Sequence, residues 1–347
     1  MNQGPDFLIL GQGLLGSLLA LDLCAQGASV IIADFAPRRC SSLVSAGMMD
    51  PISGQRFALS WRYEETTTYA LSVYEKLSSL IGQPLITPRT IYRIFRDTND
   101  SDTFHKKYTS GTLTPYIADI FTHSPHPDVA APFGGVTIQG GYHIEVGQLI
   151  HSLRQYFIES NQLLINPDPA FLENLNVKAT IHCTGAYAHL SHYFSWLPFR
   201  NSRGETIIFD APDFYTDAIL NNGNWIAPMK TGRYRAGATY AWESLFHPPT
   251  EAGYIAISAH IKTLIPKINT QIMSTESGTR SIMADSRPVI GQHPIHSTHW
   301  VASGLGSKGT QIAPFISSHL SKSLIKNTPI DDEISINRFL KKYLTHP

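Results

Sequence analysis

Two glycine clusters, far apart in the chain, are the residues whose types and spacing most clearly suggest chemistry. The first is GQGLLG, from Gly11 to Gly16, and the second is SGLGSKG, from Ser303 to Gly309. Glycines at this spacing let a backbone turn sharply and bring its N–H groups close to an anionic ligand. Each cluster is followed by an apolar stretch of helical character, so each would present a helix N-terminus to the ligand.

The first cluster lies between elements that fit a nucleotide-binding unit. Phe7 to Leu10 and Ser29 to Ala33 are predicted strands, and the leucines between Leu14 and Leu23 predict the helix that joins them. The order of strand, tight turn, helix and strand is typical of a unit that binds the diphosphate of a dinucleotide.

Each glycine of the first cluster has its own predicted task. Gly11 permits the tight turn, Gly13 lets a diphosphate approach the backbone, and Gly16 lets the helix pack closely against the strand. Asp34, at the end of the second strand, would accept hydrogen bonds from ribose hydroxyls. A carboxylate at this position disfavours a 2′-phosphate, so the sequence favours FAD or NAD over NADP.

Composition excludes several other classes of protein. Lys and Arg together number 27, as do Asp and Glu, so no overall field draws the chain to nucleic acid or an anionic membrane. The three cysteines are unclustered and the histidines form no ligand pattern, so neither a disulfide framework nor a metal site is expected. We find no signal peptide, membrane span or hydrolase motif, and expect a cytoplasmic protein.

The segment after Asp34 separates FAD from NAD. SSLVSAG, residues 41–47, is a run of small residues without a clear period, and DPISG at residues 50–54 predicts a turn. Such a segment is either a surface loop or a loop that lies along an extended cofactor and donates backbone N–H groups to its diphosphate and ring.

At these residues the sequence resembles the FAD-dependent amine and amino-acid oxidoreductases related to D-amino-acid oxidase, glycine oxidase and sarcosine oxidase. Their Ser-rich segment leading to Ala-Gly is matched by residues 41–47. Further segments match in the same order along nearly the whole chain: GGVTIQGGYHIEVGQLIHSL (134–153), ATIHCTGAYA (179–188), WIAPMKTGRYRAGATY (225–240), TRSIMADSRPVIGQHP (279–294) and SGLGSKGTQIAP (303–314).

The resemblance implies an α/β fold, α+β overall, with a Rossmann-type FAD-binding domain interrupted by a mixed or antiparallel β-sheet substrate domain. The expected FAD-binding domain comprises residues 1–51, 141–204 and 276–347, and the expected substrate-binding domain comprises residues 52–140 and 205–275. Two departures stand out: the segment before Thr180 is short, and Ser281 stands where the family's Arg-Pro pair would place proline.

The resemblance also implies the residues that hold FAD. The family's covalent-flavin members attach it through a cysteine in the C-terminal part, and this chain has none after Cys183, so we expect non-covalent FAD. The expected FAD-binding residues are Gly11, Gly13, Leu14, Leu15, Gly16, Asp34, Phe35, Ser42, Ser45, Ala46, Gly47, Met48, Thr184, Gly185, Gly304, Leu305, Gly306, Ser307, Lys308, Gly309 and Thr310.

The second glycine cluster is expected at the pyrimidine edge of the flavin ring. A helix starting near Thr310 would there stabilise the negative charge that builds on reduction. We expect glycines because the backbone itself must touch the ring. Lys308 would add a positive charge at the ring, or its side chain extends into solvent.

Arginines are the main candidates for binding a substrate carboxylate. Arg280, at the family's Arg-Pro position, suits a bidentate pair with a carboxylate, the alternative being a structural ion pair. Arg56 and Arg235 are second choices, for which a solvated or structural role is at least as well supported. Tyr240 and Trp225 are expected either to line the pocket or to pack in the core.

The resemblance implies hydride transfer from the carbon next to nitrogen to flavin N5, giving an imine that water hydrolyses, with O₂ or another acceptor reoxidising the flavin. The expected substrate is a small amino acid or secondary amine. An alternative comes from the C-terminal third, which resembles the flavin domain of the bifunctional enzyme that removes a carboxymethyl group from modified wobble uridine in tRNA. A third hypothesis is a flavoprotein without turnover.

Overall fold

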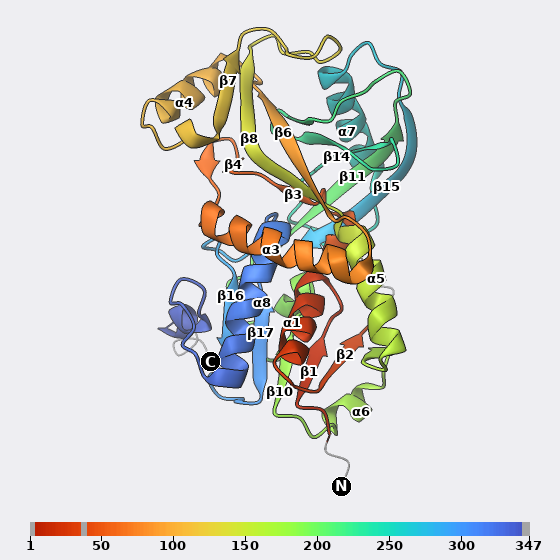
Figure 1. Cartoon of the computed structure of the whole chain (residues 1–347), viewed down its shortest axis with the longest axis vertical. Coiled ribbons are helices and arrows are strands. Elements are labelled where there is room, and N and C mark those ends of the chain that lie inside the picture. The colour runs from red at the N-terminus through yellow and green to blue at the C-terminus, as the bar shows by residue number, and fades with distance from the viewer. Residues whose placement is uncertain (1–3, 36–39, 342–347) are drawn as a thin grey trace.

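The chain folds around two main β-sheets that lie one beyond the other along the long axis of the molecule (Figure 1). The structure is a computed structural model that describes residues 4–35 and 40–341. Within these residues, no helix is both long and apolar enough to cross a membrane.

A six-stranded sheet contains the first predicted strand–helix–strand unit. Its strand order is β16-β17-β10-β1-β2-β9. The five strands from β17 to β9 are paired in parallel, and β16 is antiparallel to β17. The strands are β1 (Phe7–Leu10), β2 (Val30–Asp34), β9 (Leu163–Ile165), β10 (Ala179–His182), β16 (Val289–Gln292) and β17 (His299–Ser303).

Helices cover this sheet and share its core. Helix α1 (Leu14–Ala25) packs against α8 (Gly309–Lys326), and α5 (Val146–Glu159) contributes to the same cluster of buried leucines and isoleucines. Because α1 is enclosed by the sheet and by neighbouring helices, its leucines are buried around most of its surface. Helix α6 (Pro169–Glu173) and the 3₁₀ helices η2 (Gly185–Leu190) and η3 (Ile336–Phe339) complete this half.

A nine-stranded, mostly antiparallel sheet forms the other half. Its order is β15-β11-β14-β13-β12-β6-β8-β3, with β7 paired to β8 and a parallel pairing between β12 and β6. The strands are β3 (Met48–Met49), β6 (Ile86–Ile94), β7 (Ile117–Phe121), β8 (Gly135–Ile144), β11 (Ser202–Asp210), β12 (Ile219–Asn221), β13 (Trp225–Pro228), β14 (Tyr234–Gly237) and β15 (Gln271–Arg280).

Two hydrophobic clusters pack on this second sheet. Helix α7 (Glu251–Leu264) covers one region, and α4 (Thr98–Tyr108) covers another around Phe57 and Phe104. The small hairpin of β4 (Ile52–Ser53) and β5 (Ala58–Leu59) and the 3₁₀ helix η1 (Thr114–Tyr116) are the remaining elements near this sheet. The predicted α/β class, with a Rossmann-type unit and an antiparallel sheet, is confirmed.

Helix α3 (Tyr63–Ile81) lies between the two halves and anchors the start of α8 (Figure 1). The Tyr74 hydroxyl donates a hydrogen bond to the carbonyl oxygen of Thr310 over 2.7 Å. The Gln311 side chain donates to the Thr66 hydroxyl over 2.7 Å. These buried polar contacts therefore anchor the first residues of α8, next to the second glycine cluster, and fix the direction of the α8 N-terminus.

Candidate active site

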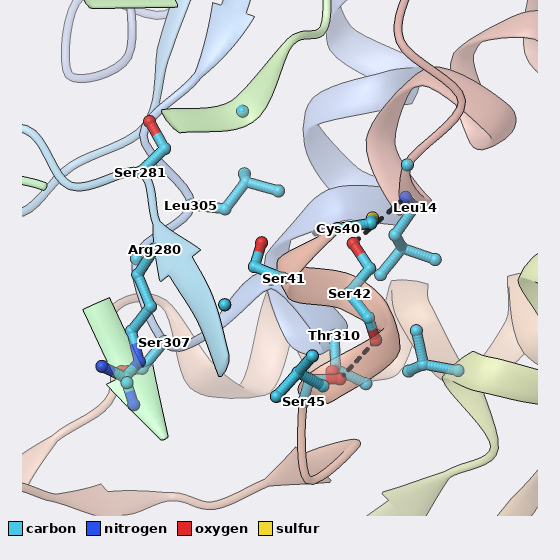
Figure 2. A pocket seen from close by; sticks show the side chains of 18 of the residues that line it. Leu14, Cys40, Ser41, Ser42, Ser45, Arg280, Ser281, Leu305, Ser307 and Thr310 are labelled. Atoms are coloured by element: carbon cyan, nitrogen blue, oxygen red, sulfur yellow. Dashed lines mark hydrogen bonds between the residues drawn. The ribbon is translucent and has the colours of Figure 1, made fainter. Parts of the chain in front are cut away.

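Both glycine clusters line one cavity of about 760 Å³, to which the two sheets contribute. The first cluster enters from the β1–α1 turn and the second from the β17–α8 turn. The short helix α2 (Ser41–Val44) lies beside them, and Figure 2 shows its serines facing the same space as Leu305, Ser307 and Arg280. The size falls within the range of ordinary ligand sites.

The turn before α1 needs glycine at two positions for different reasons. Gly11 has φ +103°, and a Cβ there would lie 2.7 Å from the carbonyl oxygen of Cys183. A Cβ on Gly16 would overlap the carbonyl oxygen of Gly11, so Gly16 permits the close packing that the sequence predicts. Gly13, by contrast, faces the cavity.

The N-terminus of α1 offers backbone N–H groups to an anion. Gly13 is its N-cap and provides no side-chain cap, and Ser42 Oγ accepts a hydrogen bond from the Leu14 amide over 3.3 Å (Figure 2). Helix N-termini of this kind bind phosphate through unpaired N–H groups and the helix dipole. The α1 N-terminus and Ser42 therefore fit a diphosphate.

Asp34 lies where a ribose would be expected and has a cationic partner. Its carboxylate accepts a hydrogen bond from the Gln12 amide and pairs with Arg154 over 2.8 Å. Arg154 also donates to the Gln12 side chain. These three residues line the cavity, so the pair defines one end of it and leaves carboxylate lone pairs for hydroxyl groups.

The second glycine cluster has backbone angles that favour glycine. We expected glycines there because the backbone must touch the flavin ring, whereas the reasons found in the structure lie within the protein itself. Gly304 and Gly306 have φ +78° and +59°. A Cβ on Gly304 would lie 2.6 Å from Met283 Cγ, so the protein itself excludes a side chain there. A Cβ on Gly306 would have no atom within 4 Å, so only its backbone angle favours glycine.

Ser281 joins the second glycine cluster to the strand that carries Arg280. Its hydroxyl bonds the Ser303 hydroxyl over 2.8 Å and accepts from the Gly304 amide over 3.2 Å, and its carbonyl accepts from the Gly306 amide over 2.7 Å. The replacement of the family's expected proline by serine therefore adds hydroxyl contacts between the two ends of the site.

Lys308 is half-buried and lines the cavity, with its side chain directed into the wall. Its Nζ donates a hydrogen bond to the backbone carbonyl of Asp50 over 3.1 Å. Burial lowers the pKa of Lys308, an effect that the negative charge of Asp50 opposes. Burial raises the pKa of Asp50, which Lys308 and Arg93 oppose.

Arg280 is a half-buried cation on the cavity wall, without an anionic partner among the described residues. Its guanidinium lies under the ring of Tyr240, 4.4 Å from the centroid, and a Cβ on Gly204 would overlap it from another side. It donates long hydrogen bonds to the Ser202 hydroxyl, 3.3 Å, and to the Thr239 carbonyl, 3.5 Å. Within the described residues no carboxylate pairs with it. Burial lowers its pKa.

The other two arginine candidates do not reach the cavity. Arg235 pairs with Glu276 over 2.6 Å and donates to the Val44 carbonyl, which makes it a structural ion pair between β14 and β15. Arg56 is exposed in the turn between β4 and β5. We therefore withdraw both as substrate ligands, because neither lines the cavity.

Aromatic side chains form part of the wall around Arg280. The predicted Tyr240 and Trp225 both line the cavity, together with Tyr187 and Phe246, whose rings stack with centroids 4.1 Å apart. Tyr240 is 54% exposed, so its ring is at the cavity mouth rather than in the core.

Sequence reasoning missed several lining residues, among them Arg93, Asp50 and Asn221. Arg93 is buried in β6 between Tyr92 and Ile94, and a charged residue between these two was the available signal. Apart from Gly16, whose role is in packing, every expected FAD-binding residue lines the cavity. Within the described residues, no cluster of side chains could hold a metal ion.

Known proteins resemble the chain in sequence and in fold. A protein-family model described as "DAO: FAD dependent oxidoreductase" matches residues 6–322. A glycine oxidase from Bacillus subtilis is 29% identical over 119 residues, which cover 34% of this chain and 32% of that protein. The match thus spans about a third of that relative.

Two solved structures have the same overall fold. Glycine oxidase from Geobacillus kaustophilus superposes with a TM-score of 0.79 at 18% identity, covering 94% of this chain and 96% of that one. Iminodiacetate oxidase from Chelativorans sp. BNC1 superposes with a TM-score of 0.77 at 19% identity, with the same coverage.

Proposed function

The chain belongs to the DAO family of FAD-dependent oxidoreductases, and we propose that it oxidises the C–N bond of a small amino acid or secondary amine bearing a carboxylate. The observation that carries the substrate class is Arg280, a half-buried guanidinium on the cavity wall that pairs with no carboxylate of the described residues. An anionic ligand stabilises a partly desolvated cation of this kind, and the planar fork of the guanidinium matches a carboxylate. The glycine oxidase relative and neighbour support this choice.

The residues present fit FAD at both ends of the cavity. The α1 N-terminus and Ser42 would hold its diphosphate, and Asp34 its ribose hydroxyls. The open space over Gly306 and the N-terminus of α8 would take an edge of its ring. When bound, FAD supplies the hydride acceptor, flavin N5, that C–N oxidation requires.

The chain's own residues would bind and orient the amine. Arg280 would hold the carboxylate, and its own position is fixed by Gly204 beneath it and Tyr240 above it. Tyr240, Trp225 and the Tyr187–Phe246 stack would limit the approach of water and position the carbon next to nitrogen. A substrate that enters as the neutral amine needs no protein base for this step.

We also propose that the two halves of the molecule have different roles. Residues 1–51, 141–204 and 276–347 would bind FAD, and residues 52–140 and 205–275 would cover the substrate. Both are required, because the cavity lining draws on each sheet. A cytoplasmic location stays a prediction.

Peroxide release tests the role of Arg280 when the holoenzyme is given matched amines in the presence of O₂. We expect activity with glycine or sarcosine and much less with methylamine or dimethylamine, which lack the carboxylate. Arg280→Met should raise KM by about tenfold to a hundredfold, and Arg280→Lys by less, as expected for a charged hydrogen bond. Arg233→Met, which alters an exposed pair with Asp210 outside the cavity, is the control.

A second candidate substrate is the carboxymethylaminomethyl group of a wobble uridine in tRNA. One observation favours it: Tyr240, which lines the cavity, and Trp242, two residues further along the chain, are 54% and 68% exposed and offer rings on which a base could stack. If modified tRNA is altered while free amino acids give no peroxide, this candidate replaces the first. If neither reacts and FAD is bound, the chain is a flavoprotein without this turnover.

A further inference from the structure

Helix α7 has an apolar outer face that lies against no other part of the described chain. Its inner face packs on the second sheet through buried aliphatic side chains, whereas Ile255, on the opposite side, is 58% exposed. Three further exposed residues near Ile255 are small: Ala252, Ala256 and Ala259. Helix α7 lies far from the N-terminus, and none of its residues lines the cavity shared by the two sheets (Figure 1).

A hollow of about 320 Å³ lies beside this face, between α7 and the start of β15. Its walls include Ser258, Ala259 and Lys262 from α7. Thr270 and Ile272 contribute from the other side. The surface of α7 therefore carries a protruding aliphatic side chain and, one turn further along the helix, a hollow that can receive such a side chain.

The two ends of α7 carry opposite charges on the same outer face. Glu251 is the first residue of the helix and Lys262 is in its last turn, and both are exposed. Among the described residues, neither of them forms an ion pair. If two copies of α7 lie antiparallel across a two-fold axis, Glu251 of each copy lies beside Lys262 of the other, and the charges attract at both ends.

The same antiparallel register also matches the apolar features. Glu251 and Lys262 are centred on the peptide bond between Ala256 and Ile257, and so are Ile255 and Ser258. A register that pairs the charges therefore places Ile255 of each copy opposite Ser258 of the other, at the hollow. A two-fold interface requires a surface that is complementary to itself, and this face is so in both charge and shape.

We propose that the outer face of α7 is the interface through which two copies of this chain form a symmetric dimer, with the two α7 helices antiparallel. Residues 252–259 contain no charged side chain, so the centre of this interface buries no ionic group. Covering Ile255 would remove apolar area from water in both copies. A helix of this length spans about 21 Å, so the interface is small and the dimer should dissociate on dilution.

Sedimentation velocity of the full chain across a dilution series measures the dissociation constant of the dimer. Ile255→Glu should raise this constant by about a hundredfold or more, because the two-fold axis places two carboxylates in apolar contacts. Leu80→Glu is the matched control, since Leu80 is a 60% exposed aliphatic residue on another helix, α3. The control should leave the dissociation constant unchanged.

Charge reversal tests the antiparallel register separately. Glu251→Lys and Lys262→Glu should each raise the dissociation constant by about tenfold, and by less at high salt, because each variant places like charges together at both ends. The double variant restores opposite charges and should recover most of the lost affinity. Its melting temperature should still fall, because both charges then oppose the helix dipole. A purely structural role would lower the melting temperature without changing association.

A wild-type chain that stays monomeric at the highest concentration would overturn the inference. So would a dimer whose dissociation constant is the same in Ile255→Glu, because its interface would then lie on another surface. A double charge reversal that associates no better than the single variants would exclude the antiparallel register. Flavin content should be unchanged in every variant, since none of the altered residues lines the cavity.

Discussion

At the scale of single residues, Gly204 shows how a small side chain can support a site without touching the ligand. It has no left-handed backbone angle, and its Cβ position is occupied by the Arg280 guanidinium. Gly204→Ala should therefore displace Arg280 and weaken carboxylate binding about tenfold, while FAD is retained. Gly147→Ala is the control, because a Cβ there meets no neighbouring atom. Unchanged carboxylate affinity in Gly204→Ala would show that Arg280 does not bind the acid.

Lys308 donates a hydrogen bond to the Asp50 backbone carbonyl, and its charge opposes the raised pKa of the buried Asp50 carboxyl. Lys308→Met should lower the free energy of unfolding by about 1 to 3 kcal/mol, because it leaves the Asp50 carbonyl without its donor and removes a positive charge near the buried Asp50 carboxyl. The double variant Lys308→Met with Asp50→Asn should lose less free energy of unfolding than the sum of the losses in the two single variants. Chemical denaturation measures these values, with the exposed Lys107→Met as control. Simple additivity would mean that the two groups do not interact.

At the scale of elements, the β17–α8 turn is open above Gly306. Gly306→Val should abolish FAD binding, because a β-branched residue is strained at φ +59°. Gly306→Asn tolerates this angle, so its stability should be near that of the wild type while its side chain enters the space assigned to FAD. Fluorescence titration measures the FAD affinity of both variants. Full FAD affinity in Gly306→Asn would place the ring elsewhere.

The pairing of β10 with β17 should make stability depend on pH. His182 packs beside His299, 3.1 Å between ring nitrogens, and burial lowers the pKa of His182 to about 3 from its usual 6.5. The unfolded chain then binds the proton more readily, so stability is greatest above pH 6.5 and falls as the pH drops toward 3.

Between pH 7.5 and 5 this histidine should account for a loss of about 2 kcal/mol in unfolding free energy. His182→Leu should flatten the dependence, whereas the exposed His123→Gln should leave it as in the wild type. The check is a series of denaturant titrations across this pH range. If the free energy of unfolding depends on pH with the same slope in the wild type and in His182→Leu, groups other than His182 cause the pH dependence.

Elements with strong local patterns could be predicted from the sequence, and contacts between distant segments could not. The predicted strands and helix agree with β1, α1 and β2 to within a few residues, because their apolar spacing is set locally. The pairing of Arg235 with Glu276 depends on the register of β14, β11 and β15, which no local pattern encodes. The contribution of Arg93 likewise depends on where β6 lies in the sheet.

At the scale of the whole molecule, function depends on one cavity that neither sheet forms alone. The first sheet provides the helix N-termini for a diphosphate and a ring edge, and the second provides Arg280, Tyr240 and Trp225. Helix α3, packed against α8, ties the halves together. Because residues of both clusters line this one cavity, we propose that the two glycine clusters serve one extended cofactor, which would explain why the sequence contains both.

Anaerobic mixing of the yellow holoenzyme with matched amines tests the central claim most directly, since loss of flavin colour reports oxidation of the substrate without depending on the electron acceptor. We predict that an amine with a carboxylate, such as glycine, sarcosine or a dicarboxylated amine, bleaches the flavin, and that the same amine without its carboxylate does not. In Arg280→Met, the difference in flavin bleaching between amines with and without a carboxylate should disappear. Bleaching that is equally fast with and without the carboxylate, or no bleaching by any amine in an FAD-loaded protein, would contradict the account.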